Sequence, residues 1–171
     1  SLAISLVCLL GMFEWVKNKF KNLFLGFFII FNFGLCSILY VLLNENVYVL
    51  YGLIIINTAI FDTFAYVVGS KFGANLIVKK ISPNKTLEGL VGGVIGSAIF
   101  GLMLGYLYDI NFIALIFVLG AFLAFIGDLF ISYFKRQAEV KDTGSILPGH
   151  GGILDRIDSH LIATPILILL L

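Results

Sequence analysis

The chain has 171 residues, of which 60% are hydrophobic and only 12% charged, and its mean hydropathy is +1.08. A typical soluble domain has roughly 25% charged residues. This composition excludes a soluble globular protein and predicts an integral membrane protein, with membrane lipids as its surroundings.

Six apolar runs follow one another along the chain. The first, residues 1–13, is short, and we expect an incomplete span rather than a signal peptide because it has no basic flank and no small-residue cleavage site. The last run, residues 161–171, is also short and is expected to be a second incomplete span. Four runs between them approach the roughly 20 residues that a helix needs to cross the hydrocarbon: residues 23–43, 47–68, 90–108 and 112–134. The predicted fold is an all-α polytopic transmembrane bundle, with residues 1–171 as a single integral-membrane domain.

Positive charges occur only in the odd-numbered connections between these runs. Connections 44–46 and 109–111 contain no Lys or Arg. Because positive residues stay on the cytoplasmic side, the odd connections are expected in the cytoplasm of a protein of the cell (inner) membrane. All 11 Lys and Arg residues agree with this orientation: Lys17, Lys19, Lys21, Lys71, Lys79, Lys80, Lys85, Lys135, Arg136, Lys141 and Arg156.

Two carboxylates lie inside predicted spans. Asp62 precedes Gly69 by seven residues and Asp128 precedes Lys135 by seven, so both lie roughly 10 Å below the cytoplasmic exit. An Asp in the hydrocarbon costs about 2.5 to 3.5 kcal/mol on insertion scales, so such residues normally face a wet cavity or a partner. For Asp62, pairing with a polar neighbour such as Asn57 is the structural alternative.

A polar stripe continues from Asp128 toward the cytoplasm. Ser132, Lys135 and Arg136 follow at helical spacings of four, seven and eight residues, so they share one face with the carboxylate. A stripe of this kind suits a phosphate and its metal ion.

A second acidic pair precedes the last apolar run. Asp155 and Asp158 are three residues apart and share a face with Ser159 if a helix begins near Leu154. Oxygen ligands without paired thiols or imidazoles favour a hard cation, magnesium or manganese. The alternative is that Asp residues near a helix N-terminus only complement its dipole.

Two segments rich in Gly, Pro and Ser could hold an anion. In residues 148–152, Pro-Gly-His-Gly-Gly, the small residues leave backbone N–H groups open to an anion. In residues 82–89, Ser82 or Thr86 could cap the next helix while Lys85 faces an anion, although a simple turn and cap also explains this segment. The glycines that follow, such as Gly92, Gly93 and Gly96, are typical of close helix packing.

These motifs together resemble the signature of the phosphatidate cytidylyltransferase (CDP-diacylglycerol synthase) family. The signature runs from Ser132 to Asp158 as Ser, two residues, Lys-Arg, four residues, Lys-Asp, then Leu-Pro-Gly-His-Gly-Gly and Asp-Arg-x-Asp. Two upstream segments resemble other family motifs in the same order, and the resemblance covers residues 57–159. Family members usually carry more amino-terminal spans, so we expect this chain to lack some of them. The two upstream segments are Asp62-x-x-Ala65-Tyr66-x-x-Gly69 and Ile81-Ser82-Pro83-Asn84-Lys85-Thr86-x-Glu88-Gly89.

The resemblance implies transfer of a cytidylyl group from CTP to phosphatidic acid, with Mg²⁺ or Mn²⁺ as cofactor and no nucleic acid partner. It leaves open whether a monovalent cation assists and whether the chain forms a homodimer. Metal binding is expected from Asp128 and Asp155, with Asp62 as a further candidate. Catalytic roles are expected for Lys135, Arg136, Asp142, His150, Arg156 and Asp158. Substrate binding is expected from Ser82, Lys85, Thr86, Ser132, Lys141, Gly151 and Gly152.

Two alternatives remain at this point. One is a related enzyme that uses CTP on another lipid, such as a CTP-dependent polyprenol kinase or a synthase of archaeal ether lipids. The other is an ion- or proton-coupled transporter, which would account for the intramembrane Asp62 and Asp128. A transporter has no obvious use for the Pro-Gly-His-Gly-Gly segment, so magnesium-dependent binding of CTP would separate the two classes.

Overall fold

The computed structural model describes residues 2–43, 47–110, 112–146 and 151–170. Within this range, six helices and one two-stranded hairpin follow each other along the chain. Their order is α1 (Leu2–Lys17), α2 (Leu23–Leu43), α3 (Val47–Phe72), β1 (Leu76–Val78), β2 (Ser82–Thr86), α4 (Leu87–Tyr108), α5 (Ile113–Gln137) and α6 (Leu154–Leu170).

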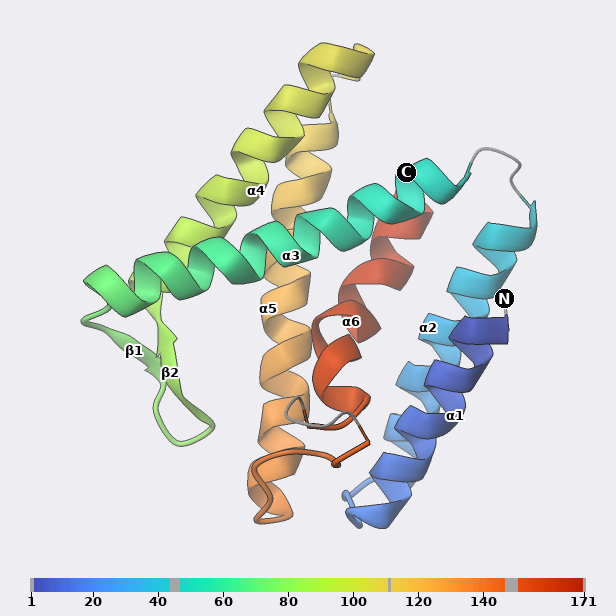
Figure 1. Cartoon of the computed structure of the whole chain (residues 1–171). Helices are drawn as coiled ribbons and strands as arrows, with labels where there is room; N and C mark the ends of the chain where they lie inside the picture. The colour runs from blue at the N-terminus through green and yellow to red at the C-terminus, as the bar shows by residue number, and fades with distance from the viewer. Residues whose placement is uncertain (1, 44–46, 111, 147–150, 171) are drawn as a thin grey trace.

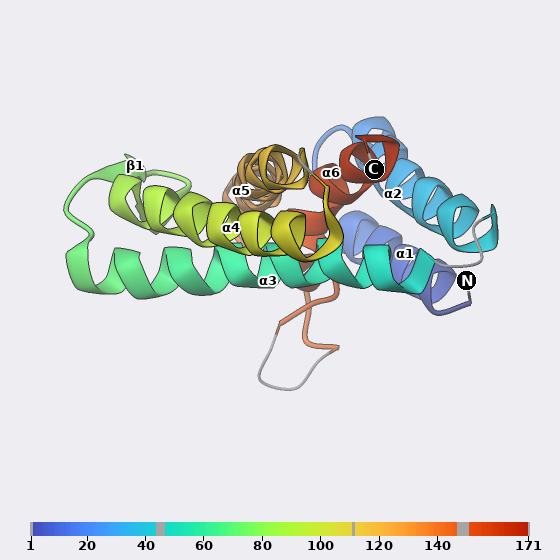
Figure 2. The same ribbon diagram turned by 90° about the horizontal axis from the view of Figure 1, so that it is seen from above.

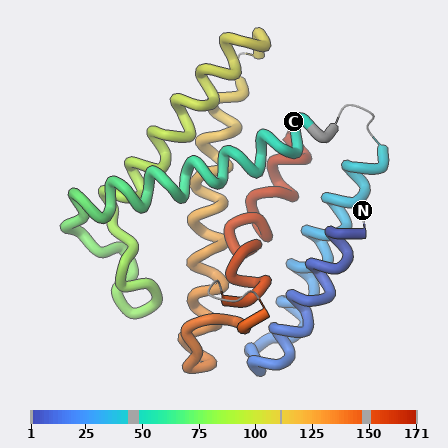
Figure 3. Tube along the Cα trace, viewed as in Figure 1, coloured from blue at the N-terminus to red at the C-terminus, as the bar shows by residue number. Residues whose placement is uncertain are grey.

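Helix α5 stands at the centre of the bundle, with α6 packed beside it (Figure 1). Helices α1 and α2 form a pair that contacts α6 on one side. Helices α3 and α4 diverge from the hairpin and run alongside each other when seen from above (Figure 2). The connection from α5 to α6 passes beside the turn between α1 and α2 (Figure 3), where Asn18 Nδ2 donates to the Thr143 carbonyl at 2.6 Å.

Four helices, α2 to α5, are long and apolar enough to cross a membrane, which confirms the four predicted spans. Their outward faces are apolar and exposed, as expected of surfaces that contact acyl chains; Phe24, for example, is 84% exposed. Helices α1 and α6 are shorter, with 16 and 17 residues. Both include acidic residues that the predicted apolar segments left out, Glu14 and Asp155.

Within the described residues, the β-hairpin departs from the predicted all-α fold. Strands β1 and β2 pair antiparallel, with Leu76 opposite Thr86. Thr86 is also the N-cap of α4, because its Oγ1 accepts from the Gly89 N–H at 3.1 Å. Of the two predicted cap residues, Thr86 is therefore correct, and Ser82 lies in β2 instead. The Glu88 carboxylate accepts from the Ala74 N–H at 3.1 Å and so ties the connection between α3 and β1 to α4.

Glycines let two helix pairs approach closely. Cβ atoms at Gly92 and Gly93 of α4 would lie 2.5 Å from side-chain atoms of α3, which confirms their predicted role in packing. Between α5 and α6, a Cβ at Gly127 would collide with the carbonyl oxygen of Asp158. This contact draws the first turns of α6 against the part of α5 that carries Asp128.

An aromatic cluster holds α1 against the C-terminal half of α5. The Trp15 ring lies 4.8 Å from the ring of Phe134 and 5.2 Å from that of Phe20, measured between centroids. Trp15 is buried, so the end of α1 is fixed next to the α5–α6 connection.

Candidate active site

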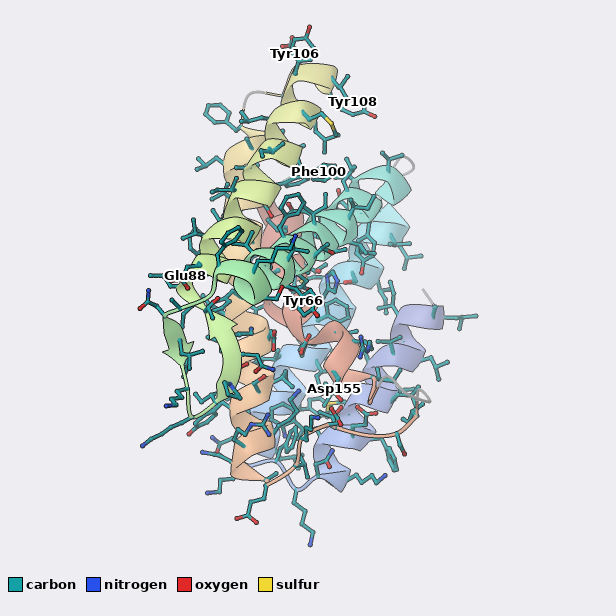
Figure 4. All side chains as sticks on the ribbon, turned by 60° about the vertical axis from the view of Figure 1, so that its left-hand side comes forward. Tyr66, Glu88, Phe100, Tyr106, Tyr108 and Asp155 are labelled. Carbon is teal, nitrogen blue, oxygen red and sulfur yellow. The ribbon has the colours of Figure 1, made fainter. Side chains whose placement is uncertain are left out.

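A cavity of about 360 Å³ opens between α3, β2, α4, α5 and α6. Tyr66 of α3 and Asp155 of α6 both line this cavity. Figure 4 shows that they lie well away from Tyr106 and Tyr108, which mark the C-terminal end of α4. The cavity collects polar residues from segments far apart in the sequence. Its lining consists of Phe61, Asp62, Ala65, Tyr66, Ser82, Asn84, Lys85, Thr86, Gly89, Leu90, Phe125, Asp128, Asp155, Asp158 and Ser159.

Asp128 connects the α5 wall of the cavity to β2. Its Oδ2 forms an ion pair with Lys85 Nζ at 2.6 Å, and its Oδ1 accepts from Ser132 Oγ at 3.2 Å. Lys85 Nζ also lies 4.6 Å from the centroid of the Phe125 ring. The predicted stripe of carboxylate and hydroxyl on α5 is therefore present, with a cation supplied by a strand.

Among the described residues, Asp155, at the first turn of α6, accepts hydrogen bonds from Lys135 and from two backbone N–H groups. Its Oδ1 accepts from Lys135 Nζ at 2.8 Å. Its Oδ2 accepts from the Thr143 N–H at 2.8 Å and from the Gly152 N–H at 2.9 Å. The Thr143 hydroxyl lies 3.0 Å from Oδ2 and shares its single proton between Asp155 and Glu14 Oε2, which is nearer at 2.8 Å. The carboxylate thus joins α5, the α5–α6 connection and α6 at one point.

These contacts keep Asp155 ionised. Burial alone would raise the pKa of its carboxyl group, but the hydrogen bonds from Lys135, Gly152 and Thr143 together outweigh burial and lower the pKa. Since the folded-state pKa is lowered, this group stabilises the fold above its ordinary pKa. That contribution is lost as the pH falls through the lowered value.

The charge and chemistry of the cavity lining fit a divalent cation. The described lining carries four carboxylates, those of Asp62, Asp128, Asp155 and Asp158, and the ammonium of Lys85. Hard cations such as Mg²⁺ prefer carboxylate oxygens. Among the described residues, however, no three acidic, His or Cys side chains already form a group that could hold a metal ion. The metal ligands therefore remain a prediction.

The other predicted site residues that the structure describes are not part of the cavity lining. Lys135 reaches it through Asp155, and Gly152 contributes its N–H to the same carboxylate. Gly151 adopts a φ of 79°, and a Cβ there would lie 2.8 Å from Asp155 Oδ2. Arg136 turns away and donates from Nε to the Ile81 carbonyl at 3.0 Å. Exposed positions are taken by Lys141, Asp142 and Arg156, and His150 lies outside the described residues.

Two buried polar residues near the site were missed in the sequence. Glu14 and Thr143 are each only 1% exposed, and the Thr143 hydroxyl donates to Glu14 Oε2 at 2.8 Å. The available signal for Glu14 was a carboxylate next to Trp15 at the end of an apolar run. Thr143 had no signal of its own, because its importance depends on partners from α1 and α6.

Comparisons with known proteins give one consistent result. A model of the cytidylyltransferase family matches residues 1–171. Over 129 residues, 72% of this chain, the sequence is 45% identical to a phosphatidate cytidylyltransferase of Staphylococcus aureus and covers 48% of that protein. Identity is 41% over 128 residues, again 72% of this chain and 48% of the relative, for the protein of that name in Staphylococcus haemolyticus. It is 39% over 119 residues for that of Rickettsia conorii, covering 64% of this chain and 52% of the relative. The chain spans about half the length of these curated relatives.

Proposed function

Because the chain belongs to the cytidylyltransferase family, we propose that the intact protein transfers a cytidylyl group from CTP to phosphatidic acid. The products are CDP-diacylglycerol, a precursor in phospholipid biosynthesis, and pyrophosphate. The relatives at 39 to 46% identity that carry the name phosphatidate cytidylyltransferase support this choice of substrates.

The observation that carries the proposal is the gathering of carboxylates and a lysine in one cavity between apolar helices. Phosphatidic acid is a lipid phosphate that lies at the membrane surface, whereas CTP comes from the aqueous side. Both are anions, so the reaction needs cationic groups at the ends of spans. Lys85 in β2, two residues before α4 begins, and Lys135 near the C-terminal end of α5 meet this need.

The reaction balances as a single displacement. An oxygen of the lipid phosphate attacks the α-phosphorus of CTP, and a new P–O bond forms. The bond from that phosphorus to the oxygen bridging to the β-phosphate breaks, and pyrophosphate leaves with the electron pair. Such a step depends mainly on positioning and on stabilising charge, and it requires no covalent enzyme intermediate.

We assign the roles of the chain's residues in this reaction from their positions in the structure. Lys85 and Lys135 supply ammonium groups for the phosphates, and Ser132 offers a hydroxyl beside Asp128. The Thr143 and Gly152 N–H groups keep Asp155 facing the cavity. We keep Lys141, Asp142, His150 and Arg156 as candidates for binding CTP, because in the sequence they lie within or next to the segment that connects α5 to α6.

A divalent metal ion, Mg²⁺ or Mn²⁺, would be held by Asp128 and Asp155, and Asp62 and Asp158 also line the cavity. When bound, such an ion neutralises negative charge on phosphate oxygens as it develops.

We also propose that the protein lies in the cell membrane with this cavity facing the cytoplasm, on the basis of the positive-inside rule. In an intact protein without Cys8 and Cys36, a Lys79→Cys variant should react with a membrane-impermeant maleimide in inverted vesicles but not in intact cells. An Ile110→Cys variant, in the opposite connection, should show the reverse pattern. Labelling of Lys79→Cys from outside intact cells would overturn the orientation.

Labelled CTP tests the reaction itself. Membranes containing the intact protein are incubated with phosphatidic acid, magnesium and CTP labelled in either the α- or the γ-phosphate. A cytidylyltransferase moves the α-label into the lipid fraction and leaves the γ-label in aqueous pyrophosphate. A lipid kinase does the opposite, and a transporter transfers neither label, so either of those results would reject the proposal.

A further inference from the structure

Glu14 is a carboxylate buried in α1 and bound to a segment more than 120 residues away. Its side chain is 1% exposed. Oε1 accepts from the Ile153 N–H at 2.9 Å, and Oε2 accepts from the Leu154 N–H at 2.9 Å. These N–H groups belong to the N-terminal end of α6, where backbone donors have no partners within the helix. Glu14 therefore caps α6 from another helix.

The same carboxylate reaches the cavity through one hydroxyl. Thr143 Oγ1 lies 2.8 Å from Glu14 Oε2 and 3.0 Å from Asp155 Oδ2. Asp155 in turn accepts from Lys135 Nζ at 2.8 Å. A continuous chain of contacts thus runs from Glu14 through Thr143 and Asp155 to Lys135, and it links α1 to the cavity lining.

The backbone around Glu14 is shaped to admit its carboxylate. A Cβ at Gly144 would lie 2.6 Å from Glu14 Oε1, and one at Gly152 would lie 2.5 Å from Oε2. Trp15, the next residue, packs against Phe134 of α5 and fixes this end of α1. The position of the Glu14 carboxylate is therefore fixed by the backbone at Gly144 and Gly152 and by the packing of Trp15.

We propose that Glu14 is a positioning residue for the cavity: from α1 it holds Thr143 and the first residues of α6 so that Asp155 faces Lys135. The functional part of this inference rests on the proposed cytidylyl transfer. Glu14 itself lies outside the cavity lining and acts through Thr143 and the α6 backbone. Helix α1 thereby helps to position the cavity residues, although most of its own residues are apolar.

Glu14→Gln tests this role because glutamine keeps the shape but not the acceptors. The carboxylate receives three donors from the described residues on its two oxygens, whereas the amide has one oxygen and an NH₂ group that must face a donor. At least one N–H of the α6 end, or the Thr143 hydroxyl, loses its acceptor. In the intact protein we expect kcat/KM for CTP to fall at least about tenfold. Glu139→Gln is the matched control, because Glu139 is an exposed residue of the same type, and it should stay within about twofold.

A second pair of variants examines the link through Thr143. Thr143→Val keeps the shape and removes the hydroxyl, and it should lower kcat/KM at least about tenfold. Thr143→Ser keeps the hydroxyl and should restore activity to within about threefold. Because both variants break one chain of contacts, combining Glu14→Gln with Thr143→Val should lose little more than either alone.

Hydrogen exchange without substrate or added metal gives a readout independent of activity. In Glu14→Gln, the amides of Ile153 and Leu154 should exchange at least about tenfold faster than in the wild type, while amides in α4 stay unchanged. If the variant keeps wild-type activity or wild-type exchange at these amides, the positioning role is wrong. Uniformly faster exchange together with full activity of the folded fraction would indicate a purely structural residue and also reject it. An inactive wild-type protein would instead reject the proposed function, while the exchange result still tests the cap.

Discussion

Replacing Asp128 with asparagine is expected to lower CTP-dependent labelling of phosphatidic acid by at least about 100-fold, the loss typical of removing a preorganised charge-stabilising group. Asparagine keeps the shape of the side chain but removes the charge that pairs with Lys85 at 2.6 Å. It also removes one of the carboxylates proposed to bind the metal ion. The measurement is the initial rate in the α-label assay, normalised to folded protein in the membrane.

Asp109→Asn is the matched control for this variant. Asp109 is exposed at the C-cap of α4 with a φ of 55°, a conformation that asparagine also adopts. It lies at the end of α4 remote from the cavity, and its replacement should leave the rate within about twofold. If Asp128→Asn keeps more than about a tenth of the wild-type rate, the proposed metal site on α5 is wrong.

Replacing Lys135 with methionine is expected to reduce kcat/KM by at least about 100-fold and to destabilise the protein by about 3 kcal/mol. Lys135 is only 9% exposed and its ammonium lies 2.8 Å from Asp155. Methionine fills a similar volume without charge, so among the described residues Asp155 keeps its Thr143 and Gly152 donors but loses its cation. A cation proposed to bind substrate phosphate is lost at the same time.

Two measurements separate these effects of Lys135→Met. Denaturant unfolding at neutral pH reports the lost ion pair, and the loss should shrink in acid, because protonated Asp155 no longer needs the ammonium. Steady-state rates at a temperature where the variant is folded report the lost phosphate contact. Lys79→Met, on the exposed turn of the hairpin, should change neither quantity. Wild-type kcat and KM in folded Lys135→Met would remove this lysine from the active site.

The spans and the intramembrane carboxylates of the cavity lining could be predicted because the bilayer imposes strict rules on sequence. A helix in hydrocarbon must be apolar over about 20 residues, so the four long runs are visible without any structure. The same rules make an intramembrane Asp conspicuous. Asp62 and Asp128 were expected at matching depth, and both line the cavity.

Pairings between distant segments could not be predicted in the same way. Helical spacing placed Arg136 on the stripe with Asp128, yet its guanidinium bonds to the Ile81 carbonyl of the hairpin. The hairpin itself was not predicted, because its strands within residues 76–86 are short and include a proline, so they show no clear alternation of polar and apolar residues. This hairpin supplies Lys85, the residue that forms the ion pair with Asp128.

The sequence by itself determined the membrane class, the number of long spans and the set of polar residues available for chemistry. It did so because burial in lipid and helical periodicity act on neighbouring residues. Only the tertiary structure decided that Asp155 binds Lys135 and Thr143, and that Glu14 caps α6. These contacts depend on how closely the helices pack, at Gly127 for example. No local pattern encodes which two helix ends will meet.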